Sequence, residues 1–144
     1  MKKFMIFLIG IGIIVTIIAG IYLKCRMLIN ETKSENRQYE DYYEKEIYGT
    51  DLATLINRVV DTNTKNEVEK DEKGQYIDNG KNSIRIDIHF LDDDRIHTLE
   101  EIYNSDTGVF VQYYNQIKFK CTKIEYHNQT GKVSYLYFEQ MATT

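Results

Sequence analysis

The strongest hydrophobic pattern in the chain is an apolar segment from Phe4 to Leu23, twenty residues that contain no charge. A helix of this length, at about 1.5 Å per residue, is about 30 Å long, which matches the hydrocarbon thickness of a bilayer. We therefore predict a basic N-terminus over residues 1–3 and a transmembrane anchor over residues 4–23, with the lipid bilayer as its partner.

The residues that follow the apolar segment indicate that it is retained. Leu23, Lys24 and Cys25 do not resemble the small-residue site at which signal peptides are cleaved, nor the small residues that precede a lipidated cysteine. The count of basic residues near the span slightly favours a cytoplasmic location for the bulk of the chain. A short basic tail before an apolar segment is instead typical of a signal-anchor. We favour a single-pass cell-membrane protein with an extracytoplasmic C-terminal domain.

Residues 24–45 are predominantly polar, and residues 30–38 are polar on every helical face. They contain no glycine or proline, and Asp41 lies four residues from both Arg37 and Lys45, which supports a helix. We predict a polar helical stalk here, with Tyr39, Tyr42 and Tyr43 packing on the domain that follows it.

Apolar residues recur at helical spacing after Gly49 and predict one amphipathic helix over residues 50–63. The stripe consists of Leu52, Leu55, Ile56, Val59 and Val60. Thr50 is expected to cap the N-terminus of this helix through its hydroxyl group.

Alternating patterns predict strands in the rest of the chain. Residues 83–91 place isoleucines and Phe90 on one face, and the preceding Asn79-Gly80 pair predicts a hairpin with a short strand at residues 75–77. Residues 117–127 and 132–140 predict two strands joined by a loop at residues 128–131. The parity change near Thr122–Lys123 predicts a β-bulge in the first of these two strands. The second has two apolar faces and is expected to be central.

Thr98 and Glu101 have the spacing of a capping box and predict a short helix at residues 99–104. Residues 109–114 fit either one or two further helical turns or a strand. Residues 46–144 are therefore predicted to form a small α+β domain, with a roughly four-stranded antiparallel sheet packed by one helix.

Composition narrows the classes of function. The 144-residue chain has a net charge of −4 and no basic stripe, so nucleic acid is not an expected partner. It contains no glycine-rich phosphate-binding motif, and its two cysteines, Cys25 and Cys121, do not form a disulfide framework. Cys121 lies on the apolar face of a predicted strand, where cysteine behaves as a small hydrophobic residue. We expect neither an enzyme nor a cofactor.

Two sets of residues are candidates for a site. His89, Asp92, Asp94 and His97 form a weak candidate metal site, but their spacing fits neither a calcium loop nor a zinc site. We expect an exposed acidic turn between solvated imidazoles. Tyrosines are frequent in the C-terminal half and suit either the half-buried rim of a small sheet or a protein-binding face. The candidate face consists of Tyr113, Tyr114, Tyr126, Tyr135 and Tyr137.

Three segments together, YEKEIYGTDLATLIN, SIRIDI and IKFKCTKIEYHNQTGKVSYLYFEQ, resemble small single-span membrane proteins without an assigned activity in clostridia and related bacteria. The resemblance implies location and shape but no chemistry. An apolar N-terminal helix followed by a sheet also looks like a type IV pilin, although no acidic residue lies between Met1 and Thr16. We expect a membrane-anchored accessory module that binds an unknown protein partner. The alternatives are a pilin-like subunit of the cell envelope and a membrane-tethered hydrolase.

Overall fold

A computed structural model describes residues 1–142 of the chain. The chain divides into two compact units, Met1–Ser34 and the residues from Glu35 onward. Thr143 and Thr144, at the end of the predicted domain, lie outside the described residues.

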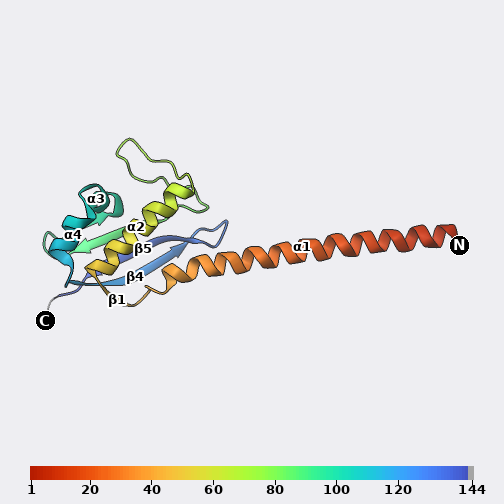
Figure 1. The fold of residues 1–144 in the computed structure, drawn as a ribbon, viewed down its shortest axis with the longest axis horizontal. Coiled ribbons are helices and arrows are strands. Elements are labelled where there is room, and N and C mark those ends of the chain that lie inside the picture. Colours follow the sequence, from red (N-terminus) through yellow and green to blue (C-terminus); the bar gives the residue numbers. More distant parts are fainter. Residues whose placement is uncertain (143–144) are drawn as a thin grey trace. The chain divides into compact units, whose positions relative to one another are not determined.

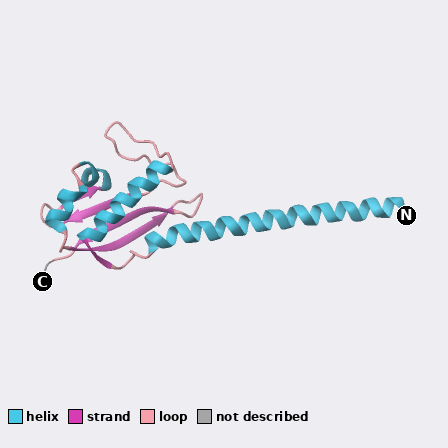
Figure 2. Cartoon of the chain, viewed as in Figure 1, coloured by secondary structure: helices cyan, strands magenta, loops and turns pink. Residues whose placement is uncertain are grey.

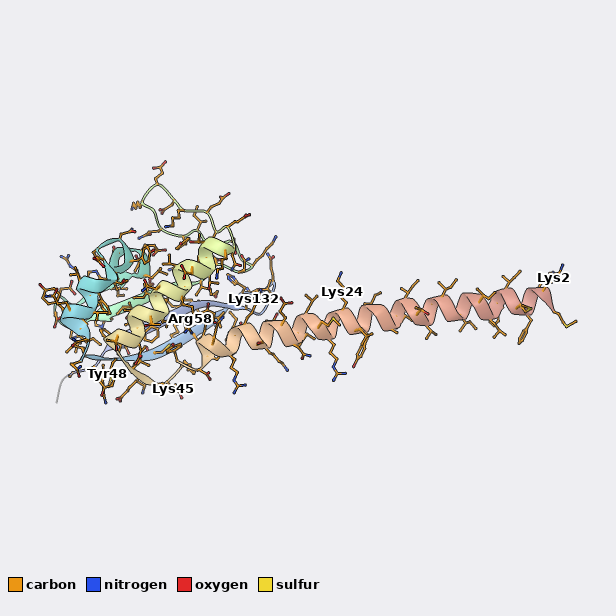
Figure 3. All side chains as sticks on the ribbon, in the orientation of Figure 1. Lys2, Lys24, Lys45, Tyr48, Arg58 and Lys132 are labelled. Carbon is orange, nitrogen blue, oxygen red and sulfur yellow. The ribbon has the colours of Figure 1, made fainter. Side chains whose placement is uncertain are left out.

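The first unit is formed by most of helix α1 (Lys2–Glu40), which is 39 residues long. Every large apolar side chain from Phe4 to Leu23 is exposed, by between 44% and 68%. Lys2 and Lys24 lie near the two ends of this apolar segment (Figure 3). Within residues 1–142, α1 is the one helix that is long and apolar enough to cross a membrane, by criteria that a signal sequence also meets.

The second unit has a sheet of five strands in the order β1-β4-β5-β2-β3. Strands β1, β4 and β5 are labelled in Figure 1. Neighbouring strands are antiparallel except β2 and β5, which are parallel. Its elements are β1 (Glu46–Tyr48), α2 (Gly49–Lys65), β2 (Arg85–Phe90), β3 (Arg95–Thr98), α3 (Leu99–Asn104), α4 (Thr107–Tyr114), β4 (Lys118–Tyr126) and β5 (Val133–Gln140). The α+β class is confirmed, whereas the prediction of four antiparallel strands is only roughly right, because the sheet is mixed and has five.

Both edge strands were missed because they are too short to show an alternating pattern. β1 has three residues and pairs with β4 at Ile47 and Phe119. The predicted strand at residues 75–77 is not among the strands of the described chain, where Tyr76 forms only an isolated bridge to Lys70. The Asn79 side chain instead accepts hydrogen bonds from the amides of residues 81–83, so Asn79-Gly80 closes a local loop rather than a hairpin.

Helix α2 lies across one face of the sheet (Figure 2), and the hydrophobic core lies between the two. The whole predicted apolar stripe of α2 is buried. The capping prediction for Thr50 was wrong, because the helix begins one residue earlier and Tyr48 occupies the cap position without a side-chain bond. Gly49 can begin the helix because it has no side chain: a Cβ atom there would lie 2.1 Å from the Tyr114 carbonyl oxygen.

The predicted details of the β4–β5 hairpin are confirmed. The register shifts between Cys121 and Lys123, at the predicted β-bulge, and β5 is central, between β4 and β2. Alternation then separates the two faces of the sheet. Cys121, Phe138 and Ile88 form one row on the buried face.

The opposite face of the sheet is polar. One row of paired residues crosses all five strands. Three consecutive members of this row, Glu46, Lys120 and Glu139, alternate in charge, which stabilises a solvated face. This row consists of Glu46, Lys120, Glu139, His89 and Ile96.

Two buried asparagines extend the backbone pairing of the sheet. Asn63, on α2, donates from Nδ2 to the Ile84 carbonyl at 2.8 Å and accepts from the Ile84 amide at 2.9 Å. Asn36, near the end of α1, donates to the Gly131 carbonyl and accepts from the Val133 amide. Each side chain therefore satisfies backbone groups that no strand partner reaches.

Candidate functional site: an aromatic pocket

A solvent-open pocket lies between the β2–β3 turn, α3 and α4. Its volume is about 240 Å³. Aromatic and aliphatic side chains form most of its lining, and a carboxylate, an imidazole and three hydroxyl groups supply polar atoms. The lining consists of Phe90, Asp93, His97, Ile102, Ser105, Val109, Phe110, Tyr113 and Tyr114. An apolar concavity with few polar groups is the usual form of a ligand site.

Local sequence determines how the two short helices position this lining. The predicted capping box is present: the Thr98 side chain accepts from the Glu101 amide, and the Glu101 side chain accepts from the Thr98 amide. α4 is capped by Asp106, which has a φ of 77° and accepts from the Gly108 amide at 2.8 Å. A positive φ at a residue other than glycine is costly, so the turn before α4 stores strain beside the pocket. This turn starts α4 so that Phe110 is buried and Tyr113 is 72% exposed.

Four aromatic rings form one connected cluster, in which three rings line the pocket and the fully buried Phe119 ring does not. The Phe90 ring lies 5.0 Å from Tyr114, 5.7 Å from Phe119 and 6.2 Å from Phe110, in edge-to-face arrangements. Phe110 and Tyr114 are stacked, with centroids 5.1 Å apart and an interplanar angle of 22°. Such pairs each stabilise by about 0.5–1.5 kcal/mol beyond their buried area, so the rings that line the pocket are supported by their aromatic neighbours.

Carboxylates hold the polar groups of the pocket in place. His97 Nε2 lies 2.9 Å from Asp93 Oδ2, and its Nδ1 lies 3.2 Å from Glu101 Oε2. The Tyr114 hydroxyl donates to Asp92 at 2.9 Å. Burial, together with this carboxylate, raises the pKa of Tyr114 to about 12. The hydrogen bond from His97 lowers the pKa of Asp93, which keeps that carboxylate ionised.

The four candidate metal ligands are not brought together. His97 pairs across the sheet with Ile88 on the buried face, whereas His89 pairs with Ile96 on the polar face, because alternate residues point to opposite sides. His89 Nε2 lies 2.9 Å from Asp94 Oδ1, whereas His97 contacts Asp93. Within residues 1–142, no group of three or more His, Cys, Asp or Glu side chains is arranged to hold a metal.

The five candidate tyrosines belong to three places. Tyr113 and Tyr114 line the pocket. Tyr135 and Tyr137 lie on the polar face of the sheet, where the Tyr135 hydroxyl donates to Asp87 at 3.0 Å. Tyr126 donates to Glu40 at 3.0 Å. They therefore do not form one continuous face.

Sequence reasoning did not include Phe90 or Phe110 in any site, and it considered Asp93 only as part of the acidic turn Asp92–Asp94. The spacing of Phe110, Tyr113 and Tyr114 in a short helix was a usable signal, since residues three and four apart share a face. No protein-family model, curated protein or solved structure matches this chain.

Proposed function

We propose that this protein is a single-pass membrane protein that presents its α+β domain outside the cytoplasm as a binding module for another protein of the cell envelope. The observation that carries the binding role is the pre-formed aromatic pocket, with Tyr113 and Val109 exposed by 72% and 46% at its edge. Aromatic side chains that are exposed and held by rigid neighbours supply binding energy at protein interfaces with little loss of entropy.

The membrane role is supported by the exposed apolar side chains of residues 4–23. Burying a large apolar side chain contributes about 1.5–3 kcal/mol relative to leaving it in water, so fifteen or so such side chains strongly favour a bilayer. Lys2 and Lys3 before the segment, and Lys24 and Arg26 after it, favour stable placement at the two interfaces.

Site-specific photo-crosslinking in native membranes tests the binding role. A benzophenone amino acid replaces Tyr113 in the full-length protein, and a matched variant carries it at Tyr48, which is 46% exposed on β1 and outside the pocket. We expect a discrete crosslinked protein species from position 113 and none from position 48. Crosslinks to lipid alone, or equal patterns from both positions, would contradict the proposal.

A further inference from the structure

The lining of the aromatic pocket specifies the chemistry of its ligand. Its walls come from α4 and from Phe90, and α4 itself carries no charged residue. Its polar edge comes from the β2–β3 turn and α3, where Asp93 faces the pocket and Asp92 accepts from the Tyr114 hydroxyl at 2.9 Å.

The charge near this edge is strongly one-sided. Asp93 lines the pocket, Asp92 accepts from Tyr114 and Glu101 contacts His97, so three carboxylates lie at or against the lining. Of the side chains that line the pocket, only His97 can carry a positive charge, and Asp93 and Glu101 lie within hydrogen-bonding distance of its two ring nitrogens. The imidazole is therefore engaged by carboxylates and leaves the negative potential at the edge in excess.

We propose that the pocket binds the cationic side chain of an arginine or lysine residue on the partner protein. The faces of aromatic rings attract cations, and guanidinium groups both stack on rings and pair with carboxylates. Tyr113, which is 72% exposed at the pocket, is placed to cover the entering side chain. This inference rests on the proposed function and adds the recognised group to it.

Matched peptides test the assignment on the full-length protein in an uncharged detergent, with fluorotyrosine NMR as the readout. The probes are acetylated tripeptides with a central arginine, lysine or citrulline; citrulline has the shape of arginine without its charge. We expect the arginine and lysine peptides to give saturable shifts at Tyr113 and Tyr114 at millimolar concentrations. The citrulline peptide should bind about twofold to fivefold more weakly than the arginine peptide, which is the effect of a single exposed cation–π contact.

Variants locate the binding within the pocket. Tyr113→Leu and Asp93→Asn should each weaken binding of the arginine peptide, whereas Tyr48→Leu, outside the pocket, should not change it. Tyr113 is largely exposed and its replacement leaves the core intact, so a loss there is not a loss of folding. Circular dichroism of each variant provides the check on folding.

The possible outcomes separate this inference from the proposed function. Equal binding of citrulline and arginine, or no saturable shift with any peptide, would overturn the cation assignment. If glycerophosphocholine binds the pocket more tightly than the arginine peptide and displaces it, the pocket would be assigned to a lipid headgroup and the protein partner would be overturned. A crosslink from position 113 without arginine binding would leave the interaction role intact and remove only the assigned ligand.

Discussion

Loss of the Asn63 side chain should destabilise the fold strongly. Its side chain is completely buried and makes two hydrogen bonds to the backbone of Ile84, at 2.8 Å and 2.9 Å. Asn63→Ala leaves the amide and the carbonyl of Ile84 buried without these partners. Each unpaired buried group costs about 1–3 kcal/mol, so the free energy of unfolding should fall by about 2–6 kcal/mol. The total free energy of unfolding of a small domain is about 5–15 kcal/mol, so this substitution should remove a large part of it.

The assay is denaturant unfolding of the full-length protein in detergent, followed by tyrosine fluorescence. Asn57→Ala is the matched control, because Asn57 lies on the exposed face of the same helix. An exposed substitution of this kind changes stability by less than about 0.5 kcal/mol. If Asn63→Ala and Asn57→Ala differ by less than this amount, the role assigned to the buried amide is refuted.

Three further predictions use the same unfolding assay. Gly49→Ala should destabilise the fold by about 1–3 kcal/mol, because the new Cβ atom would lie 2.1 Å from the Tyr114 carbonyl oxygen; unchanged stability would show that no close approach exists. Asn36→Ala should lower the free energy of unfolding by about 1–3 kcal/mol, because the Val133 amide loses its partner. Unchanged stability would show that the last turns of α1 are not part of the folded domain. Burial raises the pKa of the Cys121 thiol from its ordinary 9.0 to about 11, so the unfolded chain loses this proton first and stability should fall as the pH rises above 9.0. The fall should be smaller in Cys121→Ala, and equal slopes would contradict the assignment.

Elements with a long or chemically specific signal were predictable from the sequence. The apolar stripe of α2 and the capping box of α3 appear at the expected residues. The bulge in β4 also lies where the parity of apolar residues changes. In each of these cases, side chains within one element determine the local structure, so the pattern is visible without knowledge of the fold.

What the sequence did not reveal depends on contacts between distant segments. β1 and β3 are too short to alternate and form because β4 and β2 offer backbone partners. The parallel pairing of β2 with β5 joins residues about fifty positions apart, which no local pattern encodes. Asn79-Gly80 predicted a hairpin, but the Asn79 side chain satisfies three amides of its own loop.

The candidate site followed the same division. The two tyrosines of α4 were identified as candidates from their residue type and the frequency of tyrosine in the C-terminal half, and they do line the pocket. Phe90 and Asp93 join them only because the β2–β3 turn folds back against α3 and α4, and this arrangement cannot be read from one segment. His89 and His97 are close in the sequence but lie on opposite faces of the sheet.

Cysteine accessibility in intact cells tests the central claim, that the apolar segment anchors the protein in a membrane and the α+β domain lies outside the cytoplasm. In a Cys25→Ser background, Glu72→Cys places a thiol in the exposed loop after α2, while the buried Cys121 serves as an internal control that reacts only after denaturation. We predict that a membrane-impermeant maleimide labels position 72 in intact cells or protoplasts, and that the labelled protein stays in the membrane fraction after alkaline extraction. Labelling only after lysis would place the domain in the cytoplasm. Release of the protein by alkali would show that the apolar segment does not anchor it in the membrane.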